Sequence, residues 1–96
     1  MLVALTVRRL KPGAFDAFRA AWERDGAPPG WTRALTARKV DDRDEVVSFG
    51  FFQGDLEELR RSQQEFDYAG QRHATDEHVE AVLADGIYDV VVDLQG

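Results

Sequence analysis

The sequence predicts an α+β fold with one four-stranded antiparallel sheet, and three observations predict it. Segments rich in β-branched and apolar residues lie near both ends of the chain, at 2–10 and 88–94. Two more such segments, 31–40 and 45–52, flank an acidic turn and form a predicted hairpin. Apolar residues at helical spacing follow the first strand and the hairpin. The resulting order βαββαβ is the ferredoxin-like arrangement, in which the helices cover one face of the sheet.

The first strand and the first helix are bounded by proline and glycine. Residues 2–10 read LVALTVRRL, and the segment Lys11-Pro12-Gly13 ends the strand. A helix is predicted from Ala14, because apolar residues then recur at helical spacing. These residues are Phe15, Phe18, Ala21 and Trp22. The segment GAPPG at 26–30 cannot continue a helix, so a loop is predicted there.

The middle of the chain predicts a hairpin followed by a long helix. Residues 31–40, WTRALTARKV, and 45–52, EVVSFGFF, are predicted strands joined by the charged turn at 41–44. Asp55, with Glu58 three residues later, has the pattern of a capping box. A long second helix is therefore predicted to start there.

The last third of the chain predicts a short helix and a final strand. In the segment ATDEHVEAVLADG at 74–86, Thr75 is the predicted N-cap and Gly86 closes the helix. The segment YDVVVDL at 88–94 is then the fourth strand. Neither a repeat nor a linker is visible, so residues 1–96 are predicted to form a single domain.

The composition excludes several classes of function. The 96 residues contain no cysteine, which excludes disulfides, thiolate zinc sites and cysteine nucleophiles. The net charge of −6 argues against a nucleic-acid partner. A basic leader before an apolar run is absent, and no apolar stretch approaches the roughly 20 residues that a membrane helix needs. We therefore expect a soluble, cytoplasmic protein with no membrane partner.

Strand alternation sorts the predicted sheet into two faces of different character. The residues of one face are mostly large and apolar: Val3, Leu5, Val7, Leu35, Val47, Phe49, Phe51, Tyr88, Val90, Val92 and Leu94. Those of the other face are mostly smaller or polar: Leu2, Ala4, Thr6, Thr32, Ala34, Thr36, Val46, Ser48, Gly50, Phe52, Asp89, Val91 and Asp93. The helices can cover only one of these faces.

Two arrangements of the helices follow from this pattern. Helices over the large apolar face would allow a monomer with a polar outer face. Helices over the small face would leave the large apolar face exposed, and two sheets would then pack face to face in a homodimer. In that case the small face, with Ser48 and Gly50, is where a ligand would approach. The predicted dimer interface contains Val47, Phe49, Phe51, Val90 and Val92.

The segment VVSFGFFQG at 46–54 resembles the RNA-binding strand of RNA recognition motifs. In such a strand Phe49 and Phe51 would stack on bases. Val47, however, replaces the leading basic residue of the motif, and Gly54 replaces its last aromatic residue. The first strand, LVALTV, also supplies no aromatic partner. We therefore predict no nucleic-acid binding.

Two short motifs and the element order resemble the antibiotic biosynthesis monooxygenase family. The motifs are LKPG at 10–13 and QRHATDEH at 71–78. The resemblance implies a dimeric α/β barrel, in which two ferredoxin-like sheets pack together, and hence a homodimer. The family includes cofactor-free monooxygenases of aromatic polyketides, haem-degrading enzymes and proteins without an established activity.

The resemblance does not extend to the haem-degrading site. Those relatives use an asparagine on the first strand, a tryptophan in the long helix and a histidine near the end of that helix. The matching positions here are Thr6, Arg61 and His73, so only the histidine is retained. We therefore expect neither haem degradation nor a bound cofactor.

His73 is the predicted catalytic residue. It continues the apolar stripe of the second helix, so we predict that it faces inward, where an imidazole can act as a general base. A purely structural, hydrogen-bonded histidine is the alternative. The spacing of His73 and Glu77 lacks the H-E-x-x-H pattern, and no metal site is predicted.

The predicted ligand pocket is built from aromatic residues and one threonine. Its residues are Thr6, Phe18, Trp22, Phe52, Phe66 and Tyr68, for which core packing is the alternative role. The first functional hypothesis is a cofactor-independent monooxygenase that acts on aromatic or polyketide-like small molecules in a dry pocket. The alternative is a small-molecule-binding or interaction module of the same fold, without enzymatic activity.

Overall fold

The computed structural model describes residues 1–23 and 26–95. Within them the strands and helices follow the predicted ferredoxin-like order, with one short 3₁₀ helix added. The elements are β1 (Leu2–Leu10), α1 (Phe15–Glu23), β2 (Trp31–Arg38), β3 (Glu45–Phe52), α2 (Leu56–Glu65), α3 (Tyr68–Thr75), η1 (Asp76–His78) and β4 (Val79–Asp89). The predicted fold class is confirmed.

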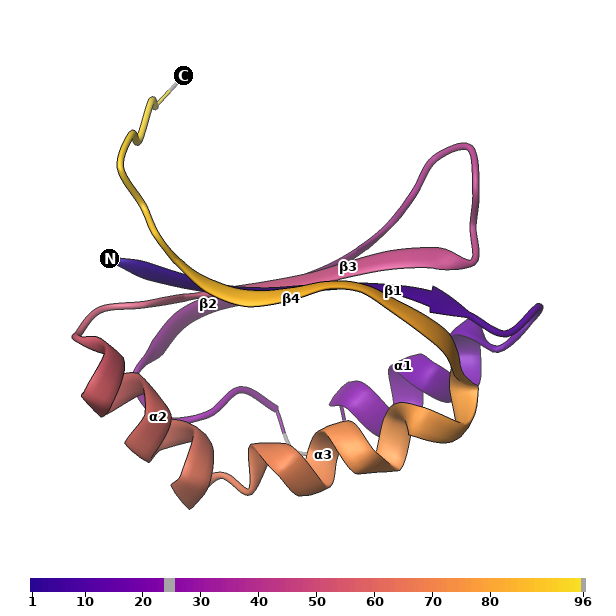
Figure 1. Cartoon of the computed structure of the whole chain (residues 1–96), viewed down its shortest axis with the longest axis horizontal. Coiled ribbons are helices and arrows are strands. Elements are labelled where there is room, and N and C mark those ends of the chain that lie inside the picture. Colours follow the sequence, from indigo (N-terminus) through magenta and orange to yellow (C-terminus); the bar gives the residue numbers. More distant parts are fainter. Residues whose placement is uncertain (24–25, 96) are drawn as a thin grey trace.

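β1 and β3 form the centre of the sheet. The strand order is β2-β3-β1-β4, and every neighbouring pair is antiparallel. The β-branched and aromatic residues of β3 suit a strand that is paired on both sides. Helices α1, α2 and α3 all lie on the same side of the sheet (Figure 1). The register places Thr6 of β1 opposite Ser48 of β3, beneath these helices.

The helices cover the face that carries the small and polar side chains. Buried and half-buried residues alternate along β3, and the buried set includes Ser48 and Gly50. Two apolar clusters pack the helices against this face of the sheet. One contains Leu2, Phe52 and Leu59, and the other contains Leu10, Phe18 and Val46. Of the two helix placements that the sequence allows, the protein therefore has the one with the helices over the small face.

The opposite face of the sheet, here called the open face, carries large apolar side chains. It contains Val3, Leu5, Val7, Leu35, Val47, Phe49 and Phe51, all of them half-buried. The rings of Phe49 and Phe51 meet edge to face, with centroids 6.0 Å apart. The β2–β3 loop and the segment after β4 rise from the sheet on this side (Figure 1). No helix of the described residues covers the open face.

The sequence predicted that Val90 and Val92 belong to the fourth strand, but both lie beyond its end. β4 ends at Asp89, and the described segment that follows has no regular secondary structure. The backbone N–H of Val90 still donates to the carbonyl of Met1, at 3.0 Å, whereas Val92 is 68% exposed. Their predicted place on the sheet was wrong because the strand begins and ends earlier than the sequence pattern indicates.

The helix predicted within 74–86 was also wrong, because most of this segment belongs to β4. The spacing of Val79, Val82 and Leu83 is typical of a helix. In the fold, however, Val79 and Val82 pair with β1, and Leu83 lies at a shift in the register of the two strands. The same pairing places Asp85 opposite Thr6. Tertiary pairing has overridden the local helical pattern.

The predicted long second helix is divided into α2 and α3 at Asp67. The capping box at Asp55 and Glu58 is present, and the Glu58 N–H donates to Asp55 Oδ1 at 2.8 Å. Asp67 has the left-handed backbone angles φ 58° and ψ 51°, and its side chain caps α3. Because α3 starts anew after this break, its residues do not continue the apolar face that the sequence predicted for one long helix. Thr75 ends α3 instead of capping a further helix, and its hydroxyl donates to the Arg72 carbonyl at 2.7 Å.

Candidate functional site

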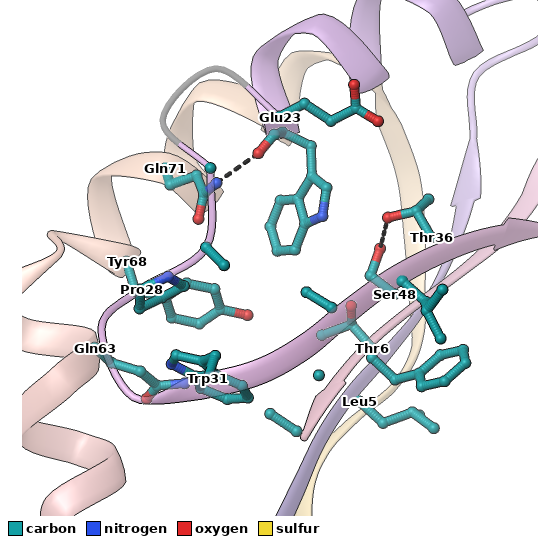
Figure 2. Close-up of a pocket in the computed structure, with 18 residues that line it drawn as sticks. Leu5, Thr6, Glu23, Pro28, Trp31, Thr36, Ser48, Gln63, Tyr68 and Gln71 are labelled. Carbon is teal, nitrogen blue, oxygen red and sulfur yellow. Dashed lines mark hydrogen bonds between the residues drawn. The ribbon is translucent and has the colours of Figure 1, made fainter. Parts of the chain in front are cut away.

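A cavity of about 330 Å³, here called the inner cavity, lies between the sheet and the helices. Its volume falls at the lower end of the roughly 300–1,000 Å³ typical of small-molecule sites. The polar and aromatic residues that line it come from both layers: Thr6, Trp22, Trp31, Thr36, Ser48, Gln63, Tyr68 and Gln71. Figure 2 shows these side chains around the space above the sheet. The small residues Ala4, Ala34 and Gly50 create that space on the sheet side.

A second cavity, here called the outer cavity, adjoins the inner one beside β4. It has a volume of about 460 Å³ and shares Thr6, Gln63 and Tyr68 with the inner cavity. Charged residues are part of its lining, namely Arg60, Arg72, Asp85 and Asp89. The site thus combines a chamber rich in aromatic side chains with a charged outer part.

Tyr68 is the side chain that belongs to both cavities and carries a titratable group. It is the first residue of α3, directly after the turn at Asp67, and its ring projects into the inner cavity (Figure 2). The ring meets Trp22 edge to face at 6.0 Å. Burial raises the pKa of the Tyr68 phenol, and the positive charges of Arg72 and Arg8 oppose that shift. The phenol is therefore neutral at physiological pH and able to donate a hydrogen bond.

Gln71 ties α3 to the end of α1. Its side-chain amide donates to the backbone carbonyl of Trp22, and this hydrogen bond is drawn in Figure 2. Gln71 is buried, so the bond is shielded from water. Trp22 is held from its other side by the stacked ring of Phe18, at 6.1 Å and an interplanar angle of 10°. These contacts position Trp22 as a wall of the inner cavity, beside the ring of Tyr68.

Trp31 and Gly50 shape the far wall of the inner cavity. Trp31 packs against the backbone of Gly50, where a Cβ atom would lie 2.8 Å from the indole Cε3. The indole Nε1 is buried and has no hydrogen-bond acceptor among the described residues. Ser62 of α2 donates its hydroxyl to the Pro29 carbonyl, which fixes the loop before Trp31.

Arg8 is a functional candidate that the sequence predictions did not include. Its side chain is only 2% exposed, and the guanidinium lies against the ring of Trp22 with 4.6 Å between Cζ and the ring centroid. Nη1 donates to Thr6 Oγ1 at 2.9 Å, whereas Nη2 is buried without an acceptor among the described residues. The alternation of side chains along β1 could have identified Arg8, because it places Arg8 on the same face of the sheet as Thr6.

The structure brings only some of the predicted pocket residues together. Thr6, Trp22 and Tyr68 line the inner cavity. Phe18 and Phe52 are buried in the two apolar clusters instead. Phe66 is half-buried at the C-cap of α2 and is not among the described lining residues of either cavity. The pocket is consequently more polar than the sequence predicted.

The predicted inward orientation of His73 was wrong. Its side chain is 89% exposed, and its Nδ1 lies 3.5 Å from a carboxylate oxygen of Asp76. The break at Asp67 shifts the phase of α3, and this turns His73 away from both cavities. Asp85 is the carboxylate that the fold brings near Tyr68 instead, and it accepts a hydrogen bond from Arg72 at 2.9 Å.

The described part of the chain contains neither a metal-binding cluster nor a membrane helix. Within residues 1–23 and 26–95, no group of three or more His, Asp or Glu side chains comes together in a way that could hold a metal ion. None of the helices in these ranges has the length and apolar character required to cross a membrane.

Solved structures share this fold over nearly the whole chain. A candidate antibiotic biosynthesis monooxygenase from Chloroflexus aurantiacus superposes with a TM-score of 0.77 at 19% sequence identity, over 99% of this chain and 96% of that chain. A second candidate monooxygenase, from Nitrosomonas europaea, superposes with a TM-score of 0.73 at 17% identity, over 96% of this chain and all of that chain. The chain has the fold of these proteins.

SnoaB, a cofactor-independent oxygenase from Streptomyces nogalater, has the same fold. It superposes with a TM-score of 0.69 at 15% identity, over 99% of this chain and 97% of that chain. No family model matches the sequence, and no curated protein matches it either. Likeness at these identities shows the fold alone, and the residues of this chain determine its chemistry.

Proposed function

We propose that the protein is a cofactor-independent monooxygenase that acts on small aromatic or polyketide-like molecules. The observation that carries the proposal is the inner cavity, where Trp22 and Trp31 provide flat apolar walls beside the neutral phenol of Tyr68. The fold shared with SnoaB, a cofactor-independent oxygenase, supports the same reaction class.

The substrate in this reaction supplies its own electrons. A CH₂ group that is activated by neighbouring aromatic rings and a carbonyl loses a proton to give a carbanion, whose charge is shared with the carbonyl oxygen as an enolate. The carbanion transfers electrons to O₂ and forms a C–O bond, which gives a hydroperoxide after protonation. Loss of water then leaves a ketone, so that CH₂ and O₂ become C=O and H₂O.

Two side chains of the site have the chemistry that these proton transfers require. Asp85 is a carboxylate beside Tyr68, and we assign to it the removal of the proton from carbon. Tyr68 is held neutral by burial, and we assign to it the donation of a proton to the reduced oxygen. The walls of the cavity limit access of water to the reactive anion.

Oxygen uptake with anthrone tests this proposal. The expected products are anthraquinone and water, in equal amounts with the O₂ consumed. Asp85→Asn and Tyr68→Phe should each lower kcat about 100-fold, which is the low end of what one general acid or base contributes. His73→Ala should leave kcat unchanged, because His73 is exposed and lies away from both cavities.

The same experiment separates the enzyme from a non-catalytic binding protein. Thermal stabilisation by anthraquinone without any oxygen uptake from anthrone would contradict the monooxygenase and favour a binding module. Oxygen uptake that survives both Asp85→Asn and Tyr68→Phe would contradict the assigned residues but not the reaction class.

We further propose that the protein forms a homodimer through the open face. Seven half-buried apolar side chains, among them Phe49 and Phe51, gather there without a helix over them in the described residues. Monomers rarely expose contiguous apolar patches of more than a few hundred Å². A second copy of the same sheet offers an equally apolar surface, because a two-fold interface pairs each patch with itself.

A further inference from the structure

Arg8 places a full positive charge behind the wall of the inner cavity. The residue is 2% exposed, and described acidic side chains make no ion pair with it. Asp85, the acid whose charge reaches Arg8, is already paired with Arg72 at 2.9 Å. A buried charge without a counter-ion is costly, and the nearby aromatic faces of Trp22 and Phe18 offset only part of that cost.

The groups that surround this guanidinium are themselves lining residues. Thr6 accepts its hydrogen bond, Trp22 covers its face, and its positive charge acts on the Tyr68 phenol. All three line the inner cavity. Nη2, still without an acceptor among the described residues, belongs to the same cluster. The positive charge is therefore one side-chain layer away from any ligand in the cavity.

The hydrogen bond from Arg8 also determines how Thr6 can act. A guanidinium only donates, so Thr6 Oγ1 must be the acceptor, at 2.9 Å. The hydroxyl proton of Thr6 is then available for another partner, and no described residue accepts it. The proton of the Tyr68 phenol is available in the same way, since burial keeps the phenol neutral.

We propose that Thr6 and Tyr68 form a subsite for a negatively charged oxygen, and that Arg8 is the positioning residue that polarises this pair. The ligand class is an aromatic molecule with an ionised phenol or enol. Both hydroxyls donate to that oxygen, and the guanidinium behind them supplies the opposite charge. The inference deepens the proposed function, on which it rests for the cavity being the ligand site, because the enolate of the substrate carries such an oxygen.

Binding of a nitronaphthol and of its methyl ether tests the subsite without turnover. The phenolate of the nitronaphthol is coloured, so absorbance reports the ionisation of the bound ligand. In the wild type we expect the phenolate to bind at least about tenfold more tightly than the ether, as one charge-assisted hydrogen bond would give. The pKa of the bound nitronaphthol should fall correspondingly, by about one unit.

Variants assign this effect to the polarising charge. Arg8→Met should remove most of the preference and return the pKa of the bound nitronaphthol close to its value in water, while Arg8→Lys should restore part of both. Arg61→Met is the matched control, because it removes an exposed positive charge of α2 that is not among the described lining residues of either cavity, and it should change neither. If Arg8→Met does not fold, Thr6→Val tests the same subsite and should lower the preference several-fold.

The proposal is overturned if the wild type binds the ether as tightly as the phenolate, or binds neither. It is also overturned if Arg8→Met and Arg61→Met behave alike. A preference for the phenolate without oxygen consumption from anthrone would support the subsite and contradict the monooxygenase. Oxidation of anthrone without a preference for the phenolate would support the monooxygenase and contradict the subsite.

Discussion

Arg8 and Tyr68 differ in how far the sequence reveals them. Tyr68 is an aromatic residue in a predicted helix, so a pocket role could be predicted from residue type. Arg8 is a charged residue in a strand, and such residues are mostly exposed. Its burial becomes visible only after α1 has packed onto the sheet, because the ring of Trp22 then covers the guanidinium. The burial of a charge depends on packing that residue type alone does not encode.

At the residue scale, the raised pKa of Tyr68 makes the free energy of unfolding vary with pH in the alkaline range. The unfolded chain releases this proton near pH 10, the ordinary tyrosine pKa, whereas the folded protein retains it to higher pH. The folded state then binds more protons than the unfolded state, so stability falls as the pH rises above about 10. Urea unfolding across this range should show a shallower fall for Tyr68→Phe than for the wild type.

Tyr88→Phe is the control for this pH dependence, because Tyr88 is 49% exposed and lies on the other side of the sheet from Tyr68. An equal effect of the two substitutions would contradict the assignment to Tyr68.

At the element scale, the accuracy of the sequence predictions follows the range of the interactions involved. The strands of β1, β2 and β3 and the capping box of α2 depend on local patterns, and they were predicted close to their observed bounds. β4 depends on pairing with β1, which is distant in sequence, and its own residues have helical spacing. The break at Asp67 depends on one pair of backbone angles, which the continuous apolar stripe concealed.

Asp67 allows a direct test of that break. Its left-handed backbone is tolerated by Asn and Gly but is strained for β-branched residues. Asp67→Val should therefore lower the free energy of unfolding by about 2 kcal/mol, since it adds backbone strain and removes the cap of α3. Asp67→Asn should change it by less than about 0.5 kcal/mol, because Asn both tolerates these angles and caps helices. Equal losses in urea unfolding would contradict the importance of the left-handed turn.

At the scale of the whole molecule, the sequence predicted two sheet faces but could not tell which one the helices cover. Both faces contain enough apolar residues to pack against helices, and side-chain alternation is the same in either case. The structure decides the question, because small residues at Ala4, Ala34 and Gly50 leave room for the inner cavity beneath the helices. The face left uncovered is then the one available to a second copy.

The proposed homodimer predicts that a carboxylate introduced on the open face prevents dimerisation, whereas one introduced on the helix side does not. Light scattering should give the mass of a dimer for the wild type and of a monomer for Phe51→Asp, which places a carboxylate within the open face. Leu56→Asp is the matched control, since Leu56 is 44% exposed on α2, on the other side of the sheet. A monomeric wild type, or a Phe51→Asp variant that stays dimeric, would contradict the interface.

The close contact between Gly50 and Trp31 makes position 50 a control on ligand size. A methyl group there would lie 2.8 Å from the indole and push it toward the inner cavity. Gly50→Ala should therefore weaken binding of three-ring anthraquinone about tenfold or more, yet change the affinity for a two-ring nitronaphthol by less than about threefold. Adding Trp31→Phe to this variant should restore the three-ring ligand. One absent side chain would thus select among substrates by their length.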